Sequence, residues 1–281
     1  MQRVLRSLLM AALIGVASAA AADPGRSRVM VPAGPAEIEV IAEGSGPLVV
    51  MLPSRGRDSE DYDEVAAAIA ARGYRVLRPQ PRGMHRSAGP MQGLTLHDFA
   101  GDVAAVIAAQ HAGPAVIVGH AYGNWVARMT AVDHPTLVRG VVLAAAAAKS
   151  YPPGLSEAVT RSADPAVPEA ERRRYLEMAF FAPGHDPSAW LTGWYPAASL
   201  SQRDAADRTR QSEWWAGGAV PLLDLQAGDD PFKPAASRNE LKDEFGDRVT
   251  IAVIPGTRHA LLPEAPEAVA EAIVAWMRRL P

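Results

Sequence analysis

Three short segments of the chain hold side chains suited to acid–base chemistry. The first is a turn bounded by glycines at 119–123, Gly-His-Ala-Tyr-Gly, which follows an apolar run and precedes a helical pattern. The second carries Asp229 and Asp230, and the third carries His259; each follows another apolar run. An imidazole oriented by a carboxylate is a competent general base. If the segments meet in the fold, they predict a site for proton transfer.

The sequence lacks the residue patterns that thiol, metal and nucleotide chemistry would need. The chain has no cysteine, no pair of histidines four residues apart around a glutamate, and no glycine-rich phosphate-binding loop. We therefore expect no metal and no cofactor. The formal net charge is −3, with both signs interspersed, so we expect neither nucleic acid nor an anionic membrane surface as a partner. A small molecule is the expected ligand.

Short apolar runs alternate with helical patterns along the chain, which predicts an α/β fold with a mostly parallel sheet. The expected strands are 28–31, 38–42, 48–52, 75–78, 115–118, 138–145, 222–226 and 249–254. The expected helices between them are 61–72, 96–109, 122–133, 237–245 and 265–280. Thr95 and Asp98 have the spacing of a capping box at the second of these helices. Because ligands bind at the carboxyl ends of parallel strands, the three segments should meet there.

Residues 149–218 interrupt this alternation. The segment is rich in proline, alanine and charge, yet it holds four of the six tryptophans, at 190, 194, 214 and 215. A disordered linker is poor in aromatic residues. We therefore predict an inserted cap with an apolar lining, containing a helix at 169–181.

The first 22 residues have the layout of a secretory signal. Arg3 and Arg6 precede an apolar run from Leu8 to Val16, and small residues follow up to Ala22. The run is shorter than the ~20 residues that span a bilayer. We expect cleavage after about Ala22, a single domain at 23–281, no stable membrane span after removal of the signal, and a secreted or periplasmic protein.

The turn at 119–123 resembles the nucleophile elbow of the α/β-hydrolase family, Gly-x-Ser-x-Gly, with Ala121 at the position of the serine. The segments around Asp230 and His259 resemble the family's acid and histidine loops, in the family's chain order. The resemblance implies an eight-stranded sheet, with His259 as base and Asp230 as acid; Asp229 is the alternative acid. It also implies that the backbone N–H groups of Tyr122 and Arg55 stabilise an oxyanion.

Two segments depart from the family pattern. Residues 80–87 carry Gln80 and His85 where relatives commonly have aspartate and glycine, and residues 52–57 lack the usual His-Gly pair. The resemblance places His120 beneath the turn as a packing residue. We expect Arg55 and Arg57 to be solvated in their loop, with pairing to an anionic substrate as the alternative.

Ala121 excludes an acyl-enzyme at the elbow, because a methyl group cannot accept an acyl group. Three interpretations follow. His259 activates water or removes an acidic proton, with an ester, lactone or similar carbonyl compound as substrate. Alternatively, a hydroxyl from Ser54 or Tyr122 replaces the absent one. In the third interpretation the protein binds a small apolar molecule without turnover.

Overall fold

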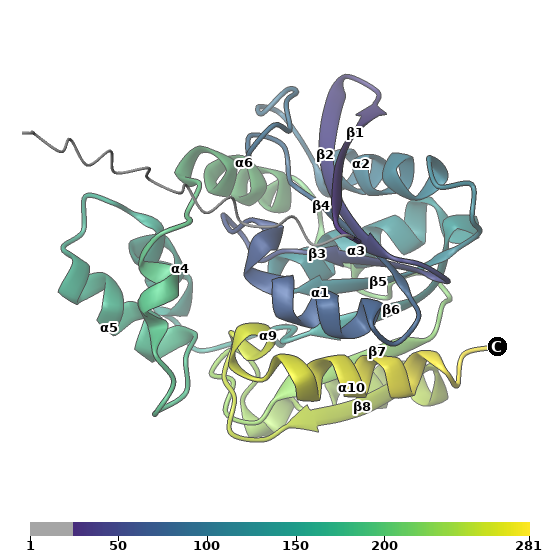
Figure 1. Ribbon diagram of the computed structural model, residues 1–281. Coiled ribbons are helices and arrows are strands. Elements are labelled where there is room, and N and C mark those ends of the chain that lie inside the picture. Colours follow the sequence, from purple (N-terminus) through teal and green to yellow (C-terminus); the bar gives the residue numbers. More distant parts are fainter. Residues whose placement is uncertain (1–24) are drawn as a thin grey trace, which may run out of the picture.

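Eight strands form one mixed sheet in the computed structural model, which describes residues 25–281 (Figure 1). The predicted signal at 1–22 lies outside the described residues. The strands are β1 Ser27–Ala33, β2 Ala36–Gly44, β3 Leu48–Leu52, β4 Arg75–Pro79, β5 Ala115–His120, β6 Val138–Ala144, β7 Leu222–Ala227 and β8 Val249–Ile254. Their order is β1-β2-β4-β3-β5-β6-β7-β8, antiparallel only for the pairs β1/β2 and β2/β4. The predicted α/β fold and mostly parallel sheet are confirmed.

The central strands are buried on both faces, as their continuous apolar runs predict. Along β3, Leu48, Val50 and Leu52 join the core on one face, while Val49 and Met51 join the core on the other. This alternation follows from the two-residue period of a strand.

Helices cover both faces of the sheet. The domain helices are α1 Asp63–Ala70, α2 Leu96–Ala108, α3 Tyr122–Asp133, α8 Glu240–Phe245, α9 Leu261–Glu264 and α10 Pro266–Met277. Helices α1 and α10 pack in the same core, while α2, α3 and α8 pack in the opposite one. Thr95 and Asp98 form the predicted capping box of α2. No helix within residues 25–281 is long and apolar enough to cross a membrane.

Two predicted helices begin later than expected. Asp58 caps a 3-10 turn, Ser59–Tyr62, by accepting the Glu60 N–H, and α1 starts only after that turn. Similarly, Ala235–Ser237 forms a 3-10 turn after Pro234, so α8 begins at Glu240. Proline presets the backbone for such a turn and removes one N–H donor.

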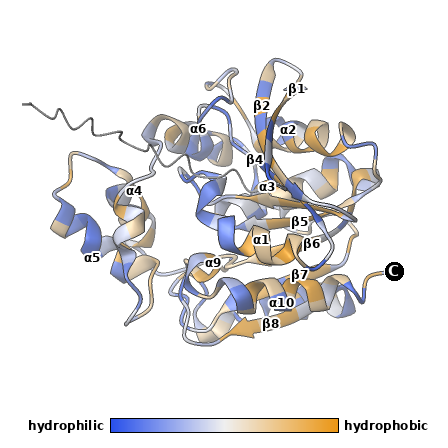
Figure 2. Ribbon diagram, viewed as in Figure 1, coloured by the Kyte–Doolittle hydropathy of each residue, from blue (hydrophilic) through white to orange (hydrophobic). Residues whose placement is uncertain are grey.

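The segment between β6 and β7 holds α4 Leu155–Ala163, α5 Glu169–Ala179, the 3-10 helix Pro187–Leu191, α6 Pro196–Asp207 and α7 Gln211–Trp214. Only α5 was expected as a helix. In Figure 1, α4 and α5 stand away from the sheet, at the left, and Figure 2 shows α5 as mostly hydrophilic. Phe180, Phe181 and Trp190 nevertheless form a core with Phe232 and Ala260 of the main domain. This core fixes the insertion against the loops that follow β7 and β8.

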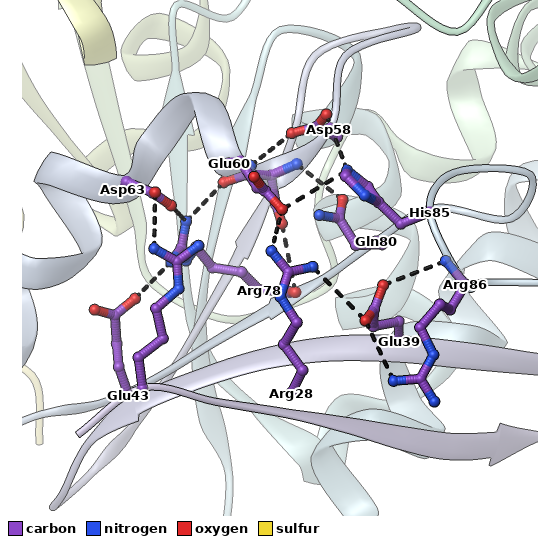
Figure 3. A network of polar contacts seen from close by, with 12 residues as sticks. Arg28, Glu39, Glu43, Asp58, Glu60, Asp63, Arg78, Gln80, His85 and Arg86 are labelled. Atoms are coloured by element: carbon purple, nitrogen blue, oxygen red, sulfur yellow. Dashed lines mark hydrogen bonds and ion pairs between the residues drawn. The ribbon is translucent and has the colours of Figure 1, made fainter. Parts of the chain in front are cut away.

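A charged network ties the antiparallel strands to the segment that follows β3 (Figure 3). Arg78 donates to the Ser59 carbonyl at 2.9 Å and pairs with Glu43 and Asp63. Arg28 joins the network through Glu39 and Glu60. Because Arg78 is fully buried, its carboxylate partners offset the cost of removing its charge from water.

Candidate active site

A sharp turn at Ala121 joins β5 to α3. Its backbone has φ 48° and ψ −116°, which is uncommon for a residue with a side chain. A Cβ added at Gly119 would lie 2.4 Å from the Gly123 oxygen, and one added at Gly123 would lie 2.5 Å from the Leu52 oxygen. The turn therefore requires both glycines, as the spacing predicts.

His259 and Asp230 form a buried pair. Their side chains are 5% and 1% exposed, and His259 Nδ1 lies 2.9 Å from Asp230 Oδ2. Asp230 also accepts the Phe232 N–H at 2.9 Å. A carboxylate only accepts, so Nδ1 carries the proton, which leaves Nε2 of the neutral imidazole as the basic atom. The alternative acid, Asp229, is exposed and does not contact His259 through a hydrogen bond.

Aromatic rings hold the imidazole from two sides. The Phe232 ring centroid lies 4.1 Å from that of His259, at an interplanar angle of 30°. Phe180, from the insertion, lies 5.6 Å away, and its carbonyl accepts the Ala260 N–H at 2.8 Å. Sequence reasoning missed both phenylalanines. The position of Phe232, two residues after Asp230, was the available signal for that one.

A buried hydrogen-bond relay connects the three loops of the site. The Ser54 N–H donates to Tyr62 Oη at 3.0 Å, Tyr62 Oη lies 2.7 Å from His120 Nδ1, and His120 Nε2 lies 2.6 Å from the His259 carbonyl. Burial, and secondarily the nearby His259, lowers the pKa of His120 to about 3. The neutral ring therefore donates from Nε2 and accepts the Tyr62 proton at Nδ1. His120 thus lies beneath the turn and links it to both neighbouring loops.

A cavity of about 580 Å³ opens at the turn. Five residues singled out from the sequence line it together: Ser54, Arg55, Ala121, Tyr122 and His259. Four further aromatic side chains line the cavity, those of Trp125, Tyr151, Phe180 and Phe232, and the volume suits a small molecule. Within residues 25–281, no group of three or more histidine, aspartate or glutamate side chains is placed to hold a metal ion.

Two backbone N–H groups at this cavity have no hydrogen-bond partner in the described chain. They belong to Tyr122, the first residue of α3, and to Arg55. The neighbouring N–H groups of Ser54 and Gly56 are bonded, to Tyr62 Oη and to Gln202 respectively. The first N–H groups of a helix are aligned donors with partial positive charge. The arrangement can therefore receive a negatively charged oxygen.

A family model described as the alpha/beta hydrolase family matches residues 49–272. The chain belongs to this family. It is 28% identical over 245 residues to a non-heme haloperoxidase of Rhodococcus erythropolis, covering 78% of this chain and 87% of the relative. It is 25% identical over 229 residues to a pyrethroid hydrolase of Sphingobium wenxiniae, covering 75% and 81%. An esterase structure from Exiguobacterium antarcticum superimposes with a TM-score of 0.77 at 18% identity, covering 90% and 100% of the two chains.

Neither alternative hydroxyl of this family member is activated in the structure. Ser54 is buried at the cavity wall, but His259 forms no hydrogen bond with it. The Tyr122 hydroxyl is buried without a partner in the described chain, and burial raises its pKa well above the usual value. A high pKa keeps the phenol protonated and makes it a poor nucleophile at neutral pH.

Arg57 corrects the expectation of a solvated loop arginine. Its side chain is 2% exposed and pairs with Asp61 through two bonds of 2.7 and 2.6 Å. Its guanidinium lies 4.7 Å from the ring centroid of Trp190 and 4.8 Å from that of Trp194. It therefore anchors the insertion and cannot meet a substrate. The tryptophans are too distant in sequence for this contact to have been predicted.

The departures at 80–87 are also structural. Gln80 Oε1 accepts the Ser59 N–H at 3.0 Å, and His85 Nε2 lies 3.1 Å from Asp58 (Figure 3). Arg82 pairs with the buried Asp102 through bonds of 2.7 and 2.9 Å. The loop is thus fastened to the segment after β3 on one side and to α2 on the other.

Proposed function

We propose that the protein hydrolyses a small ester, lactone or similar carbonyl substrate by general-base catalysis at His259. The proposal takes Ala121 as standing at the position of the family's nucleophile, so no covalent intermediate forms there. One observation carries it: the buried Asp230–His259 pair reaches the same cavity as Ala121 and two unpartnered backbone donors. A site that only binds an apolar molecule needs no oriented imidazole.

In the first step, water occupies the space beside the Ala121 methyl group. His259 Nε2 takes a proton as the water oxygen bonds to the carbonyl carbon. The carbonyl π electrons move to the oxygen, and the N–H groups of Tyr122 and Arg55 stabilise its charge. Asp230 stabilises the imidazolium that forms.

In the second step, the oxygen's electron pair reforms the carbonyl and the bond to the leaving group breaks. The leaving group receives the proton from His259 Nε2 and departs as an alcohol; the other product is an acid. Water and ester are consumed in equal amounts, and the imidazole returns to its neutral form.

The rate acceleration that this site can supply limits which substrates it can hydrolyse. General-base action contributes about 10²–10⁴ and oxyanion donors about 10²–10³. A serine triad supplies about 10⁶ in turnover that this site lacks. We therefore assign activated esters and lactones, and exclude unactivated amides.

Binding without turnover is the second candidate function. It is favoured by the methyl group at Ala121 and by the aromatic wall of the cavity. The two functions differ in what His259 does: a base is essential to the first and dispensable to the second.

The test measures hydrolysis of aryl esters and lactones by the wild-type protein, His259→Ala and Asp230→Asn. We expect turnover in the wild type and a loss of about 10²–10⁴ in His259→Ala. An unchanged rate in His259→Ala refutes the general-base mechanism. Absence of all turnover, together with an apolar ligand recovered unchanged, establishes the binding function instead.

Ala121→Ser tests the geometry directly. We expect a rise in ester hydrolysis of about 10²-fold or more, within the about 10⁶ that a triad serine is worth, and fluorophosphonate labelling at residue 121. If hydrolysis does not increase, then His259, Asp230 and the two backbone N–H donors are not placed for catalysis by a serine at residue 121. Labelling of Ser54 in the wild type would instead identify that residue as the nucleophile.

A further inference from the structure

The Arg55 side chain reaches the catalytic cavity without a carboxylate to neutralise it. No acidic group of the described chain forms an ion pair with its guanidinium. One terminal nitrogen lies 3.4 Å from Thr160 Oγ1, and the buried Nε has no acceptor. An arginine stays charged in proteins, and its planar donors match a carboxylate. The side chain therefore presents unused donor capacity beside the reacting centre.

Arg57, two residues further along the same loop, shows how this fold satisfies an arginine that is purely structural. It has a bidentate carboxylate partner in Asp61 and two tryptophan rings against its guanidinium. Arg55 has neither. The two side chains share a loop and differ in their partners: Arg57 has an anion, whereas Arg55, at the cavity, has none within residues 25–281.

The other charged groups at the cavity do not supply that anion. Arg203 and Asp207 of α6 are exposed and lie 3.9 Å apart, so they partly cancel each other. Glu157 of α4 is exposed at the rim. Burial, and then the positive charge of Arg203, lower the pKa of Arg55, while the negative charge of Asp207 raises it more weakly. Among the residues that line the cavity, no carboxylate is therefore buried.

We propose that Arg55 binds a carboxylate group of the substrate, which makes the substrate a carboxylate-bearing ester or lactone. This assignment rests on the proposed hydrolytic function. In this proposal the backbone N–H of Arg55 binds the reacting oxygen and its side chain binds the anion, so the carboxylate lies a few bonds from the reacting carbonyl.

Equilibrium binding tests the carboxylate site without turnover. Calorimetry compares glutarate, adipate and pimelate with their uncharged diamides. We expect the best dianion to bind the wild type at least about tenfold more tightly than its diamide, because a hydrogen bond to a charged group is worth about that factor. In Arg55→Met the preference should fall to within about threefold, and Arg55→Lys should keep part of it.

Two variants serve as controls, with folding checked by thermal denaturation. Arg208→Met removes one positive charge directly after α6; Arg208 pairs with Asp204 at 2.9 Å and does not line the cavity. This variant should keep the full preference. Arg203→Met should change binding less than about threefold, because exposed charges are screened. Equal binding of the diamide by the wild type, an intact preference in Arg55→Met, or its loss only in Arg203→Met overturns the proposal.

Kinetics separate this proposal from the proposed function. The paired substrates are 4-nitrophenyl hydrogen adipate and uncharged 4-nitrophenyl hexanoate. If the dianion preference holds while neither ester is hydrolysed, the hydrolytic function fails and the carboxylate site stands. If both esters are hydrolysed with equal kcat/KM and no dianion preference exists, the carboxylate site fails and the hydrolase stands.

Discussion

The neutral state of His120 makes the stability of this protein sensitive to mild acid. The ring is fully buried between Tyr62 Oη and the His259 carbonyl, and its pKa is lowered to about 3. Protonation would place a second donor at Nδ1 and add a charge in the core. The relay between the loops of the site therefore requires the neutral ring.

The free-energy change follows from the two pKa values. An unfolded histidine has a pKa of about 6.5, so between pH 6.5 and about 3 the unfolded chain binds a proton that the folded chain does not. The free energy of unfolding therefore falls as the pH falls, by up to about 1.4 kcal/mol per unit. At pH 5 the free energy of unfolding is lower by about 2 kcal/mol from this group. Above pH 6.5 the neutral His120 makes its full contribution to stability.

Urea unfolding between pH 5 and pH 7.5 measures this slope. Acidic groups also titrate, so the informative quantity is the difference from His120→Gln, whose slope should be shallower by about 2 kcal/mol over that range. His111→Asn, which replaces an exposed histidine, should keep the wild-type slope. Nuclear magnetic resonance of the wild type gives an independent reading even if His120→Gln does not fold. Titration of His120 near pH 6.5, or equal slopes in all three proteins, would refute the reasoning.

Two further pairs of substitutions test how the protein is packed. Gly123→Ala should lower stability by about 1–3 kcal/mol and abolish activity, because its Cβ would meet the Leu52 oxygen at 2.5 Å; Gly101→Ala, with open space in α2, should raise stability by about 0.5–1 kcal/mol. An equal response of both variants in urea unfolding would contradict this. Lys233→Met should cost about 3–5 kcal/mol by leaving Asp224 buried and unpaired. Adding Asp224→Leu should recover at least half of that loss, and a double variant no more stable than Lys233→Met would argue against the charge-burial explanation.

The sheet could be predicted from the sequence because its strands are recognisable from local hydrophobic patterns. The bounds of Leu48–Leu52 and Val249–Ile254 are as predicted, since both are mostly apolar runs between turn residues. The helix α4 was missed: its sequence, LSEAVTRSA, mixes polar and small residues, and its apolar contacts come from α5 and the 3-10 helix beside it. Such a helix depends on tertiary packing more than on local propensity.

Part of the site could likewise be predicted from the sequence, and part could not. The sequence was enough to predict that Asp230, His259 and Ala121 lie at one edge of the sheet. Each follows a predicted strand, and ligands bind at the carboxyl ends of parallel strands. The Tyr62–His120 contact joins residues 58 positions apart, and the Phe180 ring reaches His259 from the insertion. One sequence contains no signal for such pairings.

The backbone at residue 121 is held by contacts that do not involve its side chain. The Ala121 N–H donates to the Ala144 carbonyl at 3.0 Å, and its own carbonyl accepts the Asn124 N–H at 3.0 Å. The hydrogen bonds of the His120 relay and of the Asp230–His259 pair also do not involve the Ala121 methyl group. A serine at this position therefore meets the same turn, base and donors as the alanine does. It follows that an activity difference between Ala121→Ser and the wild type measures the chemistry of one hydroxyl, provided that their unfolding free energies agree within about 0.5 kcal/mol.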